Sequence, residues 1–101
     1  MNGLSEKIIR DALSEVYDPE LHLDIQSMGL VYKIKISDEN DVTIIMTLTT
    51  PACPYGPMLV ADVEEAVKKL KGVRNVNVEI TFDPPWSLDN IDPDIRATLN
   101  L

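Results

Sequence analysis

The segment from Thr49 to Pro57 restricts the fold of this chain more than any other, because it holds three prolines and one glycine within nine residues. Each proline fixes φ and removes a backbone donor, so neither a helix nor a central strand is expected to continue through it. The segment follows the most apolar run of the sequence and precedes an amphipathic pattern typical of a helix. It therefore joins a strand to a helix, and it places Cys53, the single cysteine, at that junction.

Apolar residues at helical spacing predict helices on both sides of this junction. The first is expected over about residues 5–16, with Ser5 as its N-cap and Asp18-Pro19 as its stop. The second follows the cysteine segment and ends near Gly72. Asp92 and Pro93 favour the start of a short helix near the C-terminus.

Three runs rich in β-branched residues predict strands over residues 31–37, 42–49 and 73–82. A polar turn at 38–41 makes the first two a hairpin, and Gly29 before them suits a turn with positive φ. The expected fold is a compact two-layer α/β (α+β) sandwich of order α-β-β-α-β with a C-terminal tail helix, as one domain over residues 1–101. The second helix would be a right-handed crossover if strands two and three are parallel; the place of strand three in the sheet stays open.

Charge and composition exclude several classes of function. The chain has 101 residues and a net charge of −8, which argues against nucleic acid or an anionic membrane surface as partner. No apolar run approaches the roughly 18 residues of a membrane span, and the first residues lack a signal-peptide pattern. With one cysteine and no internal disulfide, the expected location is the cytoplasm.

Cys53 is the first candidate for chemistry. If the following helix begins at Pro54, Cys53 is its N-cap, where free N–H groups and the helix dipole favour the thiolate that binds metals and attacks electrophiles. The alternative is simple packing, because free cysteine is among the most buried residue types. A catalytic thiol would need a base, and His22 is the single histidine. Without a second cysteine, a CxxC redox motif is excluded.

Two further features have both a functional and a structural interpretation. Asp18 and Glu20 flank Pro19 and are either a carboxylate pair for a metal or solvated acids at a helix stop. Trp86 follows two prolines and either closes the core or contacts a partner.

Five sequence blocks together resemble the metal–sulfur cluster biosynthetic family, which includes SufT-type and PaaD-type proteins and the small subunit of the cytosolic iron–sulfur targeting complex. The resemblance covers about residues 5–90, in blocks that occur in the family's order: Asp18-Pro19-Glu20, Gly29-Leu30-Val31-Tyr32, the run from Thr47 to Pro54, Gly72-Val73, and Asp83-Pro84-Pro85-Trp86.

The resemblance implies a factor that helps to mature iron–sulfur clusters or deliver them to client apoproteins. Cys53 matches the family's reactive cysteine and would bind iron or cluster; Asp18 and Glu20 match the family's acidic motif near the start of the chain and are the other candidate metal ligands. Four other residues match positions that shape the site: Thr49, Pro51, Pro54 and Trp86. The chain departs from the family at residues 26–28 and after Trp86. It also lacks the cysteine-rich C-terminal extension of PaaD-type proteins, so a role in ring-oxygenase maturation is not implied.

A stable cluster normally needs four protein ligands, and this chain offers one thiolate. We therefore expect a labile cluster or iron, with no tightly bound cofactor; a homodimer would bring two thiolates together. On this interpretation the protein is not an enzyme, and its partners are assembly scaffolds and client apoproteins. Two alternatives stay open: an adaptor that bridges scaffold and client, and a thiol enzyme with Cys53 as nucleophile.

Overall fold

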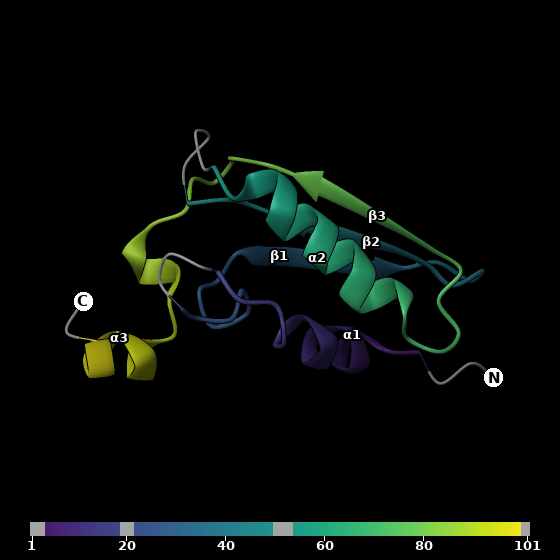
Figure 1. Cartoon of the computed structure of the whole chain (residues 1–101), viewed down its shortest axis with the longest axis horizontal. Coiled ribbons are helices and arrows are strands. Elements are labelled where there is room, and N and C mark those ends of the chain that lie inside the picture. Colours follow the sequence, from purple (N-terminus) through teal and green to yellow (C-terminus); the bar gives the residue numbers. More distant parts are fainter. Residues whose placement is uncertain (1–3, 19–21, 50–53, 100–101) are drawn as a thin grey trace.

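The computed structural model describes residues 4–18, 22–49 and 54–99, which form a three-stranded sheet with helices on one face. The order is α1 (Glu6–Leu13), β1 (Val31–Ile36), β2 (Asp41–Met46), α2 (Gly56–Lys68), β3 (Asn75–Ile80), a 3₁₀ turn (Leu88–Asn90) and α3 (Pro93–Leu99). Figure 1 shows α1 and α2 on the same side of the sheet, with α3 set apart beyond one end. The predicted α-β-β-α-β sandwich with a tail helix is confirmed.

β2 is the central strand. It pairs antiparallel with β1 and parallel with β3, which answers the question that the sequence left open. Because parallel neighbours need a long connection, α2 crosses over the sheet between them. Val42, Ile44 and Met46 alternate along β2 as fully buried residues and form the middle of the core. Among the described residues, no helix is long and apolar enough to span a bilayer.

α1 is shorter than predicted. Ser5 is the expected N-cap, and its hydroxyl accepts a hydrogen bond from the amide of Ile8 at 3.3 Å. The helix ends at Leu13 instead of residue 16, because the amides of Glu15 and Val16 donate to the carbonyls three residues back, those of Ala12 and Leu13, and not to the fourth. The chain then leaves the helical path, and Tyr17 pairs with Asp24 in an antiparallel bridge.

β2 and β3 also differ from their predicted limits. β2 ends at Met46 instead of residue 49, although the amide of Thr47 still bonds to the carbonyl of Leu30 just before β1. β3 covers residues 75–80 of the predicted 73–82. α3 begins at Pro93 as predicted, and Asp92 caps it through the amide of Asp94 at 2.9 Å.

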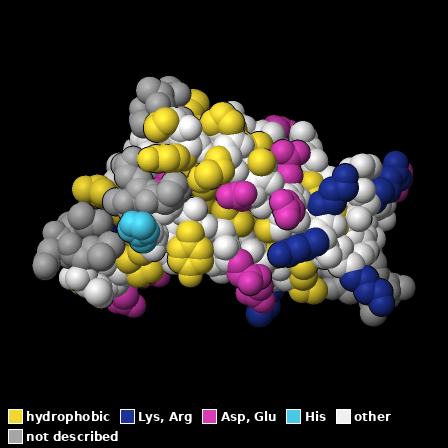
Figure 2. All heavy atoms as spheres, in the orientation of Figure 1, with side chains coloured by type: hydrophobic (Ala, Val, Ile, Leu, Met, Phe, Trp, Pro, Cys, Tyr) yellow, Lys and Arg dark blue, Asp and Glu magenta, His cyan; other side chains and the backbone are white. Residues whose placement is uncertain are grey.

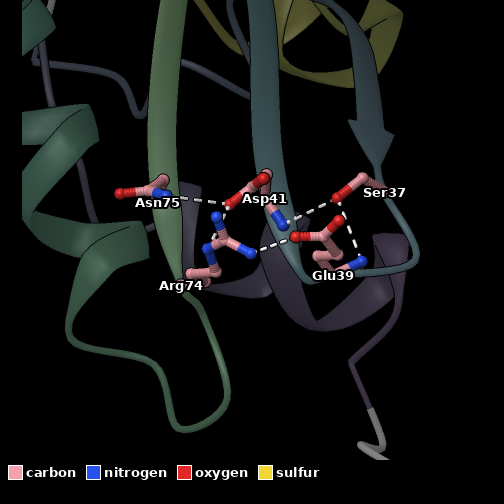
Figure 3. Close-up of polar contacts among 5 residues, drawn as sticks. All are labelled: Ser37, Glu39, Asp41, Arg74 and Asn75. Carbon is pink, nitrogen blue, oxygen red and sulfur yellow. Dashed lines mark hydrogen bonds and ion pairs between the residues drawn. The ribbon is translucent and has the colours of Figure 1, made fainter.

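A polar network ties the β1–β2 turn to the start of β3 (Figure 3). Arg74 forms ion pairs with the carboxylates of Glu39 and Asp41, and the amide group of Asn75 donates to Asp41 at 3.0 Å. The hydroxyl of Ser37 accepts from the amides of Glu39 and Asp41. These side chains are largely exposed, so the ion pairs contribute little energy each and serve mainly to set the register of β3 against the hairpin.

Gly29 lies in the connector, which is the segment between α1 and β1, at the point where it touches the C-terminal segment between β3 and α3. Its φ is +73°, as predicted, and a Cβ atom there would lie 2.2 Å from the carbonyl oxygen of Asn90. The neighbouring contacts are close as well, because the amide of Asp92 donates to the carbonyl of Ser27 at 2.9 Å. A side chain at position 29 would therefore push the C-terminal segment off the domain.

We predict that Gly29→Ala lowers the free energy of unfolding by at least about 2 kcal/mol, because left-handed strain and a backbone overlap act together. Urea denaturation followed by circular dichroism measures this. Gly72→Ala is the control, since Gly72 also has a positive φ (95°) but lies in an exposed turn. Equal losses in both variants would show that the approach to Asn90 contributes nothing.

Candidate functional site

The residues that flank Cys53 in the sequence lie at one end of the sheet. Leu48 and Thr49 continue from β2, and Pro54 and Tyr55 lead into α2. β3 is parallel to β2, with Ile80 opposite Met46, so the carboxyl ends of both strands lie at this end of the sheet. Ends of parallel strands next to a helix N-terminus are a common place for binding sites in α/β folds.

α2 begins later than the sequence suggested. It starts at Gly56 with Tyr55 as N-cap, and Tyr55 makes no side-chain capping bond. Cys53 is therefore not the N-cap, which corrects that prediction. The physical reason is that Pro54 and Tyr55 form a turn before the first helical residue. Gly56 fits because a Cβ atom there would lie only 2.9 Å from Cδ1 of Leu48.

Cys53 itself, together with Pro51 and Glu20, lies outside the described residues, so their predicted roles stay predictions. Among the other predicted site residues, Thr49 is half-buried in a bend and Pro54 is exposed in the turn before α2. These two positions border the cysteine segment from either side, as residues that shape a site there would.

Trp86 packs at the same end of the fold, on the segment before β1. Its ring is part-buried against the core, and its Nε1 donates to the carbonyl of Met28 at 2.7 Å. Two residues further on, the carbonyl of Leu30 accepts from Thr47 at 2.8 Å. The interpretation that Trp86 closes the core is therefore confirmed. The Met28–Leu30 segment therefore bonds both to Trp86 and to Thr47, the residue that follows β2.

Asp18 is buried, with 3% of its surface exposed, so it is not the solvated acid of a simple helix stop. Its amide donates to the carbonyl of Leu23 at 2.8 Å, and its carbonyl accepts from His22 at 2.9 Å. These bonds join the backbone of Asp18 to residues 22 and 23. Burial of a carboxylate is costly without polar contacts, and Asp18 has interactions beyond these backbone bonds.

His22 has a φ of +58° and an exposed side chain. Its predicted alternative role as a base for Cys53 cannot be placed, because that thiol is not described. Within the described ranges, no group of three or more His, Cys, Asp or Glu side chains is arranged to hold a metal ion.

The sequence reasoning missed two polar residues that support Trp86. The hydroxyl of Tyr32 donates to the carbonyl of Pro84 at 2.8 Å, and Asn90 donates to that hydroxyl at 3.5 Å. Together they hold the 84–90 segment against β1. The available signal for Tyr32 was its place in the block Gly29-Leu30-Val31-Tyr32, to which the sequence analysis assigned no role in supporting Trp86.

Apolar side chains lie exposed around the same end. Tyr55, Met58, Ile80 and Phe82 each keep between 37% and 44% of their surface exposed. Figure 2 shows hydrophobic side chains gathered along the upper edge of the helix-bearing face, where Figure 1 places β3 and the start of α2. A surface of this kind is typical of a contact with another protein.

Comparison with known proteins gives a consistent result. The model of the family described as "Iron-sulfur cluster assembly protein" matches residues 6–80. A Porphyromonas gingivalis protein named "Fe-S protein maturation auxiliary factor" is 39% identical over 94 residues, which are 93% of this chain and 89% of that protein. A Deinococcus radiodurans "Iron-sulfur cluster carrier protein" is 40% identical over 77 residues, which are 75% of this chain and 21% of that longer protein.

A solved structure has the same fold. The conserved hypothetical protein of Thermotoga maritima superimposes with a TM-score of 0.87 at 46% identity, over 100% of this chain and 99% of that one. Agreement over complete chains extends the likeness to the segment after β3, which lies beyond the family match.

We predict that Trp86→Phe lowers the free energy of unfolding by about 1 kcal/mol, because the carbonyl of Met28 loses its donor while an aromatic ring still fills the site. Urea denaturation followed by circular dichroism avoids dependence on tryptophan fluorescence. Tyr55→Phe is the matched control, since Tyr55 is an exposed aromatic at the same end. If both variants have the stability of the wild type, the Trp86 hydrogen bond does not stabilise the fold.

Proposed function

We propose, for a chain that belongs to the iron–sulfur cluster assembly protein family, that Cys53 binds iron or a labile cluster on its way to client apoproteins. The observation that carries this proposal is the family match over residues 6–80, which includes Cys53 and both of its flanks. The names of the relatives, a maturation auxiliary factor and a cluster carrier, support the same role.

The ligand count supports transfer over storage. One thiolate per chain cannot fill the four positions that a stable cluster normally takes. Two copies meeting at Cys53 would supply two thiolates, with small thiols or carboxylates completing the set. A cluster held by so few protein ligands leaves easily when an acceptor offers four. Exposure of Pro54 and Tyr55 beside the cysteine suits the approach of such an acceptor.

The protein, on this proposal, turns over no substrate of its own. Cys53 acts as a ligand and not as a nucleophile, and the partners are client apoproteins and assembly proteins. A second function, that of an adaptor which holds scaffold and client together, is favoured by the exposed apolar side chains around the site. The adaptor would not need the thiol, and this difference separates the two.

We predict that anaerobic reconstitution with iron and sulfide gives visible charge-transfer bands in the wild type and none in Cys53→Ser. Sizing chromatography with absorption detection shows whether the colour elutes with a dimer. Wild-type protein alkylated at the thiol is the second control, because it loses the ligand without a change of sequence. Colourless protein in all samples contradicts the carrier role and favours the adaptor, which should still bind its partners as Cys53→Ser.

The acidic motif is tested in the same experiment. If Glu20 and Asp18 complete the ligand set, Glu20→Gln and Asp18→Asn should each retain several-fold less iron per chain after desalting, because an amide is a poorer ligand than a carboxylate. Glu65→Gln, an exposed change on α2, is the control. Iron contents equal to the wild type in both variants would leave Cys53 as the protein's contribution to the site.

A further inference from the structure

β3 is an edge strand whose outer side is free among the described residues. The sheet order is β1-β2-β3, so β3 has a neighbour on one side. The amide of Thr81 donates to the carbonyl of Met46, which places the backbone groups of the odd-numbered residues of β3 toward β2. Because these groups alternate along a strand, those of Val76, Val78 and Ile80 point to the free edge.

The two edge strands, β1 and β3, differ in the features that protect an edge from pairing with a further strand. β1 carries Lys33 and Lys35, and its pairing with β2 has an irregularity between Val31 and Lys33. Lysines and such irregularities are the usual means of protecting an edge from further pairing. β3 has neither lysine nor proline, and its register with β2 runs without interruption. The β3 edge is therefore competent to pair with another strand.

A groove of ≈ 590 Å³ lies between α2 and the end of β3. Its lining consists mainly of apolar side chains: Leu48, Pro57, Val60, Ala61 and Ile80. A separate polar groove lies beside Glu15 and Tyr17, after α1. Asp62, Glu65 and Lys69 line that groove, and none of them lines the apolar one. The apolar groove is thus on the β3 side of α2, above the free edge.

Charge restricts what this groove accepts. Glu64 is its charged lining residue, and the chain as a whole carries a net charge of −8. On the strand below, Val76 and Val78 face the helices but are only partly buried, and Ile80 is 37% exposed. A further strand at this edge would cover these residues with its own apolar side chains and meet Glu64 with a cation.

We propose that the free edge of β3 binds an extended segment of a partner protein by strand addition, with apolar residues at alternate positions and a lysine or arginine opposite Glu64. Main-chain hydrogen bonds to Val76, Val78 and Ile80 give the affinity, and the groove under α2 selects the side chains. The inference rests on the proposed function only in taking that partner to be a client or assembly protein.

The test uses metal-free full-length protein and a synthetic ten-residue peptide that alternates valine with threonine and ends in two lysines. We expect saturable binding by fluorescence anisotropy. In amide hydrogen exchange followed by NMR, the peptide should slow Val76, Val78 and Ile80 by at least about tenfold, while Asn77 and Glu79, already turned toward β2, change little. A peptide N-methylated at alternate residues should bind at least about tenfold more weakly, because it cannot pair.

Variants of the protein locate the site. Ala61→Arg fills the groove and should weaken binding about tenfold, whereas Ala97→Arg, an exposed change on α3, should not. Glu64→Lys should weaken the lysine peptide and strengthen a version that ends in two glutamates. Asp62→Lys is its matched control, with the same change of charge on the other side of α2.

Three outcomes would overturn the proposal: no binding of the alternating peptide, equal binding of its N-methylated form, or slowed exchange at residues away from β3. A dimer in which Val76, Val78 and Ile80 are already protected without peptide would assign the edge to a second copy of the chain instead. Because the assay needs no metal, Cys53→Ser should bind the peptide as the wild type does. Failure of cluster reconstitution and failure of peptide binding are therefore separate results.

Discussion

The rest of this structure depends on the two-sided pairing of β2. Its antiparallel side is formed by a short hairpin, but its parallel side with β3 requires a crossover, and α2 supplies it. The crossover begins where β2 ends, and Cys53 lies in the sequence between the end of β2 and the start of α2. A hairpin between β2 and β3 would have removed both the helix and the position at which the cysteine stands.

The connector before β1 supports that end of the fold. Its backbone accepts a hydrogen bond from Trp86 through Met28 and another from Thr47 through Leu30, and Gly29 between them admits Asn90 at a distance no side chain allows. The backbone of Asp18 bonds to His22 and Leu23 at the other end of the same segment. Trp86 and Asp18, two of the residues that the family resemblance singled out, are thus tied to one stretch of backbone although they lie far apart in the sequence.

The proposed role in transfer depends on how easily a bound cluster would leave this site. A chain with one thiolate cannot hold a cluster firmly, and a transfer factor should not. Contact with the acceptor must then come from elsewhere on the surface. The exposed apolar side chains around the start of α2 and the Ile80 end of the β3 edge both lie where β2 ends, at the side chains that flank Cys53 in the sequence.

The sequence by itself determined the element order, the Ser5 and Asp92 caps, the positive φ of Gly29 and the family, because each of these depends on local chemistry or on motifs in a fixed order. Only the tertiary structure decided the ends of α1 and α2, the burial of Asp18, and the place of β3 beside β2. The physical reason is that these features depend on partners distant in the chain. Tyr17 pairs with Asp24 beyond the end of α1, and the start of β3 contacts a hairpin turn more than thirty residues earlier through Arg74.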